Sequence, residues 1–513
     1  MPPGISTSDF YYILPEIVLT AGALLVLIAD VALPKAQRGA LAWVTLLALG
    51  ATAVSLVPFT STRVEVAHGL IAVDQFALFF KVVFLLAAAI TVLMSVRYLA
   101  VEGASPGEYY FLILCATLGM FVMAGGIDLI TIFIGLETMA VSFYILAGFI
   151  KPNQRSNEAA VKYFLLGAFS LGILLYGMSL MYGLSGTTNL RVMATQFTGQ
   201  EKDPRLILAV ILVVAGVGFK IAAVPFHMWA PDVYEGAPTP ITAFLSVGSK
   251  AASFAMLIRI FVEGLPAMNA DWRLLFAVLA IITMTVGNVA AVTQSNVKRM
   301  LAYSSIAHAG YVLIGIVAWS PTNPRGITAT LIYLMIYSFM QLGAFAVLVL
   351  LHRQDVVGDE LKDFSGLHVR HPFAAFAMLL FMLCSLGWGV LFATDTLQIW
   401  HAVVLFTIHG MAGVFWAPAS QMLIHDIAGR DNLHSGVRLM AMARTLGLLG
   451  GPAVGGVMLL AFGPSLGMLL NVLIYVPLTW WLWKAPFGPA FAKEPRVALA
   501  IPGGFAAFEQ ASQ

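Results

Sequence analysis

Residues 206–265 read LILAVILVVAGVGFKIAAVPFHMWAPDVYEGAPTPITAFLSVGSKAASFAMLIRIFVEGL, and this stretch decides the fold. It holds two long apolar segments, and each carries one lysine well inside its length, Lys220 in the first and Lys250 in the second. A charge near the centre of a bilayer costs about 3 kcal/mol or more, and charged residues there are usually functional. Both lysines are therefore candidates for a functional site inside a membrane.

The backbone between the two lysines is interrupted. Pro225 removes a helix donor and clashes with the preceding turn, and further helix-breaking residues follow at Pro231, Gly236, Pro238 and Pro240. We expect a broken helix near residues 220–240, with no helix in the proline-rich part. Irregular backbone at membrane depth persists only where protein buries it or water lines it. The pattern therefore predicts a hydrated polar path beside the lysines.

The composition sets the class of the whole chain. Of 513 residues, 60% are hydrophobic and 10% are charged, and the mean hydropathy is +0.91. These values are typical of an all-α polytopic membrane protein. The formal net charge of +2 gives no case for nucleic acid as a partner. Cys115 and Cys384 form no CxxC pair and give no ligand spacing for a metal or an iron–sulfur cluster.

Apolar runs long enough to cross a bilayer recur along the chain. We predict about fifteen spans, at 10–33, 39–59, 70–95, 108–125, 128–150, 159–183, 205–227, 240–263, 273–293, 300–319, 326–351, 372–393, 398–424, 438–461 and 464–484. With the N-terminus outside, and with charges at span ends counted with the adjacent loop, sixteen of the 27 Lys and Arg residues fall in inside segments, six in outside loops and five in spans. The positive-inside rule therefore predicts that the N-terminus lies outside and the C-terminus inside.

Two further charged residues lie in predicted spans. Glu137 is in the middle of DLITIFIGLETMAVSFYILAGF, and we interpret it as a titratable carboxylate that pairs with a nearby lysine. The alternative is a structural carboxylate held by a hydroxyl or backbone group. A carboxylate–lysine pair 4 Å apart is worth roughly 4 kcal/mol at an effective dielectric of about 20. Lys162, in EAAVKYFLLGAF, begins close to its helix start, so a relay role and extension to the interface both stay open.

Histidines offer a second type of proton carrier, because imidazole both gives and takes a proton near neutral pH. His227 follows Lys220 by seven residues, which is about 10.5 Å along one face of a continuous helix. We predict a relay role for it, with a packing role as the alternative. His308 and its neighbours are expected to face the bundle, where they either conduct protons or hold helices together: Ser304, Ser305, Tyr311, Tyr333, Tyr337 and Gln341.

Three other charges in predicted spans receive a simpler interpretation. Asp74 and Lys81 lie seven residues apart, close to one helix face, so they either pair or each reach an interface, and we favour the second reading. Arg259 is near the end of its span and is expected to extend to the interface as well.

Three motifs resemble one family: LETMAVSFYILAGF (136–149), HMWAPDVYEGAPTPITAFLSVGSKAASFA (227–255) and NVKRMLAYSSIAHAGYVLIG (296–315). From the N-terminus to about Leu383, the chain is similar to the subunit N family of proton-translocating NADH:quinone oxidoreductase, respiratory complex I. That family belongs to the antiporter-like membrane proteins. The resemblance implies inverted five-helix repeats, each with a broken helix, and a central axis of charged residues across the membrane plane.

The resemblance also implies roles for the candidate residues. Matched motif by motif, Glu137 corresponds to the carboxylate of helix five, Lys220 to the lysine of the broken helix seven, Lys250 to the central lysine of helix eight, Lys162 to a lysine that modulates its neighbour, and His227 and His308 to histidines of the polar axis. The chain itself is expected to carry no cofactor. NADH, FMN, iron–sulfur clusters and quinone are expected in partner subunits.

The chain departs from the family after Leu383. A second broken helix with another buried lysine is expected there, but no lysine occurs between Arg370 and Lys484. The segment APASQMLIHDIAGRDNLHSGVRL and a glycine-rich helix resemble the major facilitator superfamily of exporters instead. We therefore predict three parts: an antiporter-like domain at 1–383, a four-helix exporter-like fragment at 384–486 and a cytoplasmic tail at 487–513.

The predicted function is proton translocation as a subunit of NADH:quinone oxidoreductase, without redox chemistry on this chain. The predicted location is the cell inner membrane, with the lipid bilayer, protons and other membrane subunits of complex I as partners. Three alternatives stay open: a cation/proton antiporter, a facilitator-type exporter, and a non-functional hybrid that lacks the second broken helix.

Overall fold

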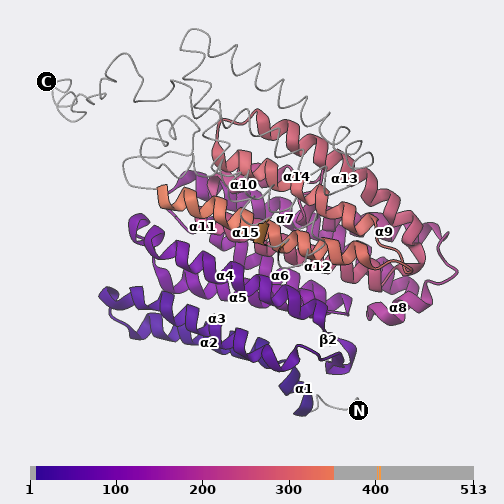
Figure 1. The fold of residues 1–513 in the computed structure, drawn as a ribbon, viewed down its shortest axis with the longest axis horizontal. Coiled ribbons are helices and arrows are strands. Elements are labelled where there is room, and N and C mark those ends of the chain that lie inside the picture. The colour runs from indigo at the N-terminus through magenta and orange to yellow at the C-terminus, as the bar shows by residue number, and fades with distance from the viewer. Residues whose placement is uncertain (1–6, 352–400, 402–403, 406–513) are drawn as a thin grey trace, which may run out of the picture. The chain divides into compact units, whose positions relative to one another are not determined.

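The computed structural model describes residues 7–351, 401 and 404–405. The chain divides into two compact units, Met1–Asp363 and Phe364–Gln513. Every helix and strand with bounds below belongs to the first unit (Figure 1). The last four predicted spans, the exporter-like fragment at 384–486 and the tail at 487–513 lie outside the described residues, apart from the three isolated positions.

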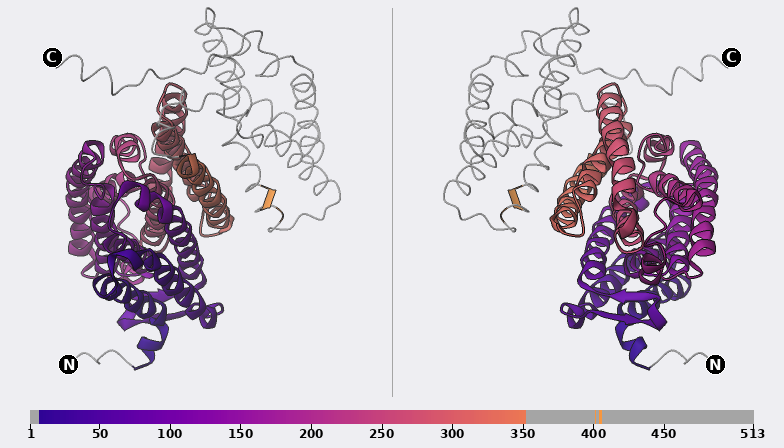
Figure 2. Two further views of the ribbon diagram at one scale, coloured as in Figure 1. Left: turned by 90° about the vertical axis from the view of Figure 1, so that its left-hand side faces the viewer. Right: turned by 90° about the vertical axis from the view of Figure 1, so that its right-hand side faces the viewer.

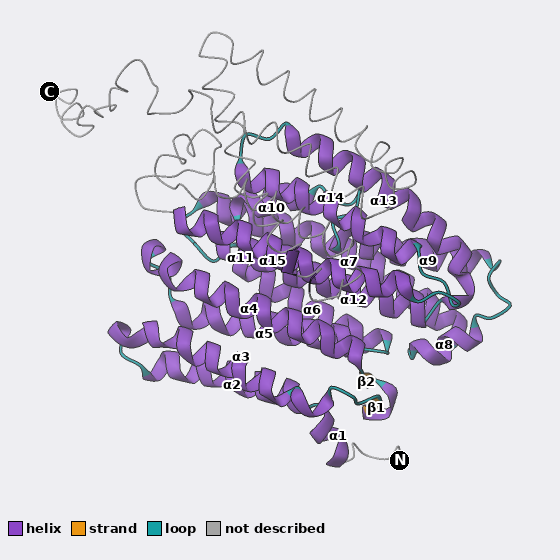
Figure 3. Ribbon diagram, viewed as in Figure 1, coloured by secondary structure: helices purple, strands orange, loops and turns teal. Residues whose placement is uncertain are grey.

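Helices make up most of the described chain, and the only strands in this part of the protein form one short hairpin (Figure 3). The α-helices are Thr7–Tyr12 (α1), Leu14–Ala32 (α2), Leu41–Ser55 (α3), Gln75–Glu102 (α4), Pro106–Gly125 (α5), Leu129–Ala147 (α6), Gln154–Ser185 (α7), Leu190–Gln196 (α8), Pro204–Lys220 (α9), Trp229–Gly236 (α10), Thr239–Phe244 (α11), Lys250–Ile258 (α12), Asn269–Val292 (α13), Val297–Val317 (α14) and Arg325–Leu351 (α15). The strands are Val64–Val66 (β1) and Ile71–Val73 (β2).

Short turns of other helix types join these elements. The 3-10 turns are Lys35–Ala40 (η1), Val57–Phe59 (η2), Ala67–Gly69 (η3) and Pro266–Met268 (η6), and the π-helical turns are Leu245–Ser249 (η4) and Arg259–Glu263 (η5).

Ten helices of the described region are long and apolar enough to cross a membrane. They correspond to ten of the eleven spans predicted before residue 352, and the eleventh is the broken helix that begins with α9. One predicted boundary was wrong, because residues 70–73 belong to a turn and to β2. β2 pairs antiparallel with β1, and Asp74 then starts α4 by accepting a hydrogen bond from the Ala77 N–H.

Side-chain caps explain where many of the helices begin. A carboxylate or amide oxygen accepts backbone N–H groups that have no partner in the first helical turn. This happens at the start of six helices, namely α4, α6, α7, α8, α9 and α14, at Asp74, Asp128, Asn153, Asn189, Asp203 and Asn296. Short polar residues between apolar runs therefore set the entry points of these helices.

One helix lies at the centre of the bundle. The elements α11, η4, α12 and η5 form a continuous helix, Thr239–Glu263, whose 18-residue apolar window is entirely buried. In the next most buried span, Pro106–Gly125, only 67% of the window is buried. The side views show the described helices packed into one bundle (Figure 2). Lys250 is thus carried by the helix that protein surrounds most completely.

Glycines bring α5 and α6 into backbone contact. A Cβ atom on Gly119 of α5 would lie 2.5 Å from the Met139 nitrogen and 2.6 Å from the Gly135 oxygen, both on α6. Small residues of this kind allow close packing of membrane helices. The contact fixes the position of α6, which carries Glu137.

Candidate functional site

The predicted break in the helix is present. The α-helix α9 ends at Lys220, and Ala222 then adopts a left-handed φ of 57° before Pro225. Several backbone groups of the break find partners: the Ala223 N–H donates to the Gly218 oxygen at 2.8 Å, and the Val224 N–H donates to Thr283 Oγ1 at 3.0 Å. The irregular backbone is therefore buried in protein, as the bilayer requires.

One part of the prediction for the break was wrong. The segment Trp229–Gly236 forms the helix α10, although it contains Pro231. Pro231 is its third residue, where the backbone N–H has no partner within the helix, so the missing donor costs little there. The indole of Trp229 also donates from Nε1 to the Phe219 oxygen at 2.9 Å, which ties α10 back to the end of α9.

Lys220 is 4% exposed and lies near aromatic and acidic groups of α6. Its Nζ atom lies 5.8 Å from the ring centroid of Tyr144, which is seven residues after Glu137 on the same helix. The charges of Glu137 and Lys220 interact. Neither Lys220 Nζ nor Glu137 Oε1 has a hydrogen-bond partner within residues 7–351. The two predicted partners are therefore close enough for their charges to interact, but they form no hydrogen bond with each other, so water or a moving side chain is free to bind their polar atoms.

Glu137 also belongs to a partly exposed face of α6. Four apolar residues of this face are 47–57% exposed, at spacings of three or four residues from one another or from Glu137: Ile130, Ile134, Val141 and Ile145. Residues at these spacings line one side of a helix. Glu137 thus lies in the middle of an apolar stripe at the side of the bundle.

Lys250 is 3% exposed and binds neutral oxygen atoms on α14. Its Nζ atom donates to the Ser305 backbone oxygen at 2.6 Å and also to Ser305 Oγ. The Tyr337 hydroxyl donates to the same Oγ at 2.7 Å, and the Tyr234 hydroxyl lies 3.4 Å from it. The lysine follows directly after the π-helical turn η4, a feature that is frequent at functional sites.

Aromatic rings connect the surroundings of the two lysines. The ring of Tyr144 meets that of Tyr163 edge-on at 4.7 Å, and Tyr163 stacks on Trp229 at 4.7 Å. Trp229 then contacts Tyr234 at 6.4 Å, and Tyr234 reaches Ser305. A contiguous row of side chains therefore runs from Tyr144, beside Lys220, to Ser305, which binds Lys250.

His308 lies at the far end of this row. Its Nδ1 atom lies 2.6 Å from the Tyr333 hydroxyl, and its ring centroid lies 5.2 Å from that of Tyr337. The expectation that the polar residues of α14 and α15 face the bundle is confirmed for Ser305, Tyr337 and Gln341, which are at most 3% exposed.

His227 does not lie where its seven-residue spacing from Lys220 predicts. Because α9 ends at Lys220, the two residues do not share a helix face, and the estimate of 10.5 Å along one face does not apply. His227 lies half-buried in the break, with its ring centroid 6.5 Å from that of Tyr303 and with no hydrogen-bond partner for Nδ1 among the described residues.

Lys162 belongs to a cluster of charges at the end of the bundle that is predicted to lie inside. Its Nζ atom lies 2.7 Å from Asp232 Oδ2 and 2.7 Å from Glu158 Oε1, and its side chain is 41% exposed. Arg299 donates from Nη1 to Asp232 Oδ1 at 2.6 Å. Partial burial raises the pKa of Asp232, but the hydrogen bonds from Lys162 and Arg299 outweigh this effect, so the pKa lies below its ordinary value. Asp232 was not among the predicted site residues, although a carboxylate between Pro231 and Pro238 of the break indicates a polar role.

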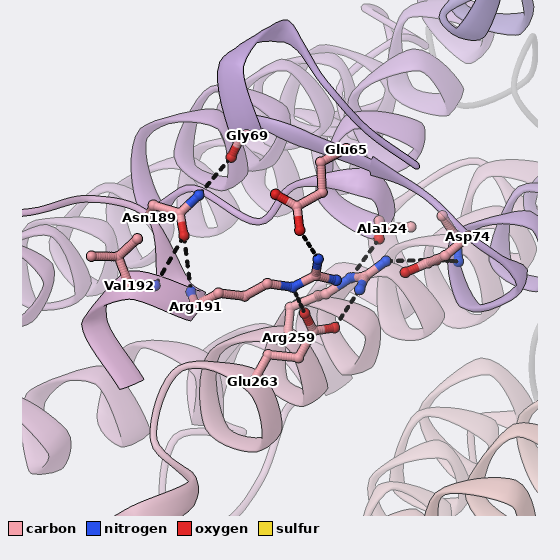
Figure 4. A network of polar contacts seen from close by, with 10 residues as sticks. Glu65, Gly69, Asp74, Ala124, Asn189, Arg191, Val192, Arg259 and Glu263 are labelled. Carbon is pink, nitrogen blue, oxygen red and sulfur yellow. Dashed lines mark hydrogen bonds and ion pairs between the residues drawn. The ribbon is translucent and has the colours of Figure 1, made fainter. Parts of the chain in front are cut away.

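The prediction that Asp74, Lys81 and Arg259 extend to an interface was wrong. Arg259 is 1% exposed and does not reach the interface, because Asp74 and Glu263 provide acceptors inside the protein (Figure 4). Lys81 is also buried, with Nζ 2.5 Å from Glu16 Oε1. Asp74 and Lys81 therefore pair with different residues. Among the described residues, no group of three His, Cys, Asp or Glu side chains is arranged to hold a metal ion.

Comparisons with known proteins agree with this geometry. The family described as NADH:quinone oxidoreductase/Mrp antiporter, transmembrane region, matches residues 126–405. A second family, described as transmembrane secretion effector, matches residues 364–505. NADH-quinone oxidoreductase subunit N 1 of Koribacter versatilis is 45% identical over 439 residues, which cover 80% of this chain and 86% of that protein.

Two further proteins extend the comparison. Subunit N of Trichlorobacter lovleyi is 46% identical over 383 residues, which cover 74% of this chain and 78% of that protein. Among solved structures, a chain of respiratory complex I from Thermus thermophilus with bound aureothin matches with a TM-score of 0.59 and 30% identity, over 85% of this chain and 97% of that chain. With its buried lysines, broken helix and membrane-spanning bundle, the chain belongs to the subunit N family of NADH-quinone oxidoreductase, the antiporter-like membrane subunits of complex I.

Proposed function

We propose that this chain is a proton-translocating subunit of NADH:quinone oxidoreductase in the inner membrane and that Lys220 and Lys250 carry the protons. The observation that supports this most strongly is the pair of fully buried lysines beside a broken helix, joined by a continuous row of polar and aromatic side chains. An ammonium bound only to neutral oxygen atoms, as at Lys250, loses no ion pair when it gives up its proton.

The coupling in this proposal is electrostatic. Movement of the Glu137 carboxylate changes the free energy of the charged form of Lys220, since the two charges interact across a medium of low dielectric constant. A proton leaving Lys220 then passes to water and through water toward Ser305 and Lys250, because the ring contacts between these residues are not hydrogen bonds and only line the path. Beyond Ser305, His308 with Tyr333 continues the row. His227 exchanges protons with water at the break. Lys162, held by Asp232, loads the inner end. Quinone reduction in neighbouring subunits drives the cycle.

The partners follow from the position of Glu137. A carboxylate in the middle of an apolar stripe is costly against lipid, so we propose that a neighbouring membrane subunit of complex I covers Ile130, Ile134, Val141 and Ile145. The flavin, the iron–sulfur clusters, NADH and quinone then belong to other subunits of the enzyme, and this chain contributes proton transfer alone.

A separate proposal concerns residues 364–505. The match to a secretion-effector family, together with the missing lysine between Arg370 and Lys484, supports a segment that derives from an exporter and replaces the second broken helix. Such a replacement lowers the proton stoichiometry of the subunit. Measuring protons moved per NADH in the assembled enzyme, with this chain and with a relative that keeps the second broken helix, tests it; equal values would contradict it.

The decisive experiment replaces Lys220 with Arg, which keeps the charge but does not give up a proton. In assembled enzyme reconstituted in vesicles, Lys220→Arg and Lys220→Ala should both abolish NADH-driven proton uptake, while NADH oxidation by an artificial acceptor persists. The exposed Lys202, changed to Arg, is the matched control and should pump normally. Normal pumping by Lys220→Arg would exclude Lys220 as a proton carrier. Sodium-dependent exchange without NADH would favour the antiporter alternative.

A further inference from the structure

The end of the bundle that is predicted to lie outside holds a chain of alternating charges, which we name the outer latch: Glu65, Arg191, Glu263, Arg259 and Asp74 (Figure 4). Arg259 donates from Nη2 to Asp74 Oδ1 at 2.8 Å and from Nη1 to Glu263 Oε1. Arg191 donates from Nε to Glu263 Oε2 at 3.2 Å and from Nη1 to Glu65. Five charges, from β1, α8, η5 and the residue that caps α4, are therefore linked without a gap.

Arg259 is the buried centre of the outer latch. Its side chain is 1% exposed, its Nε atom donates to the Ala124 oxygen at 3.1 Å, and its guanidinium lies 4.6 Å from the ring centroid of Phe76. All three nitrogen positions of the guanidinium are thus used. Asp74 is itself held, because it accepts the Ala77 N–H at the start of α4.

The outer latch is unsuited to carry protons. A guanidinium keeps its proton in proteins, so the two arginines that link the outer latch do not take part in a proton relay. Buried ion pairs also pay a large desolvation penalty, and they are often no more stabilising than apolar residues of the same size. The function of these charges is therefore better sought in the geometry that they impose.

The geometry concerns the helix of Lys250. Arg259 and Glu263 are the first and last residues of the π-helical turn η5, and η4 precedes Lys250, so the nine residues of α12 lie between two π-helical turns. Arg259 is nine residues after Lys250, which is about 13 Å along the axis. π-helical turns are rare and are found mostly as single turns inside α-helices. An anchor at η5 therefore determines the rotation and height of α12.

We propose that Arg259 is a positioning residue that fixes α12 to α4, α5 and α8, so that Lys250 Nζ is held on Ser305. The latch also joins the outer loops to this helix, since Asn189, which caps the helix carrying Arg191, donates from Nδ2 to the Gly69 oxygen at 2.8 Å. The inference rests on the proposed role of Lys250 in proton transfer.

The test is a double-mutant cycle on the assembled enzyme in vesicles, with protons taken up per NADH oxidised as the readout. The four enzymes are wild type, Arg259→Gln, Ser305→Ala and the double variant. If Arg259 acts through the contact of Lys250 with Ser305, the double variant has the same ratio as Ser305→Ala alone. A departure from multiplicative behaviour of about twofold or more marks coupled sites. If the ratio of the double variant equals the product of the two single losses, the proposal is overturned, because a purely structural effect of Arg259 would be independent of the change at Ser305.

Two controls keep the outcomes separate. Arg205→Gln removes an exposed arginine from a local ion pair with Asp203, and it should leave the ratio unchanged. Arg259→Lys replaces Arg259→Gln in the cycle if the latter does not assemble. Failure of both Arg259 variants to assemble, beside normal assembly of Arg205→Gln, would overturn the positioning role in favour of a folding role. Lys250→Ala, measured in parallel, separates the two hypotheses: normal pumping contradicts the proposed function, whereas lost pumping with a multiplicative cycle contradicts only this inference.

Discussion

Lys250 donates a 2.6 Å hydrogen bond to the backbone oxygen of Ser305, a residue 55 positions further along the chain. The contact joins the central helix to α14, and the Ser305 hydroxyl receives both the lysine and Tyr337. A single serine therefore lies between the lysine and the row of aromatic hydroxyls that leads away from it.

Ser305→Ala should reduce NADH-driven proton pumping. The backbone oxygen stays, but the hydroxyl that Lys250 and Tyr337 share is lost. A hydrogen bond to a charged group is worth about 1.5–3 kcal/mol, so the pumping rate should fall about tenfold or more. Ser253→Ala is the control, because this buried hydroxyl only returns to the Ser249 oxygen of its own helix. Equal pumping by the two variants would contradict a role for Ser305.

Lys81→Met should destabilise the subunit more than the double variant Glu16→Gln/Lys81→Met. Lys81 is buried with Glu16, and removal of one partner leaves the other as an unpaired buried charge. Such a loss costs about 3–5 kcal/mol, whereas replacing both partners is often neutral. The thermal midpoint of the purified enzyme, and the amount of subunit in membranes, provide the measurement. A double variant as unstable as the single one would show that the pair itself holds α2 on α4.

Gly119→Ala should reduce assembly of the enzyme. The added Cβ would meet backbone atoms of α6 at 2.5–2.6 Å, and overpacking of this kind costs about 1–3 kcal/mol. Gly172→Ala on α7 is a matched control, since nothing lies within 4 Å of its added Cβ. Alanine favours a helix over glycine by about 1 kcal/mol, so the control should be neutral or slightly stabilising. Normal amounts of the Gly119→Ala enzyme would argue against backbone contact between α5 and α6.

The contribution of Asp232 should depend on pH in a defined direction. Partial burial raises the pKa of Asp232, but hydrogen bonds from Lys162 and Arg299 outweigh this effect and lower it below its ordinary value near 3.9. A carboxylate with a depressed pKa stabilises the folded state above its unfolded pKa and loses this effect as the pH falls through the folded one. The difference in thermal midpoint between wild type and Asp232→Asn should therefore be largest above about pH 5 and shrink in more acidic buffer. A difference that is constant with pH would exclude this ion pair as the cause.

The sequence was sufficient for the break and for the buried lysines. Prolines disrupt a continuous helix, and a lysine in the middle of an apolar span is costly against lipid, so it usually faces the protein interior. Lys220 and Lys250 were therefore correctly predicted to be buried. The helix α10 was missed because a proline in the first turn does not break a helix, and composition alone does not reveal where that turn begins.

Pairing across the bundle was beyond the sequence. Arg259 binds Asp74, which is 185 positions away, and Lys81 binds Glu16 on another helix. Both cations were expected to extend to the interface. A buried ion pair forms instead, because another segment of the chain brings a carboxylate close to each of them. Such partners depend on helix order and rotation, which hydropathy does not encode.

The glycine contact between α5 and α6 has a kinetic consequence. Glu137 is only two residues after Gly135, so its backbone is clamped to a neighbouring helix at van der Waals distance. Displacing the carboxylate by sliding α6 would drag α5 along, a collective motion of microseconds to milliseconds, whereas reorienting a side chain takes far less time. A rotamer change leaves both helices in place, so it is the faster of the two ways in which the acidic group near Lys220 can move.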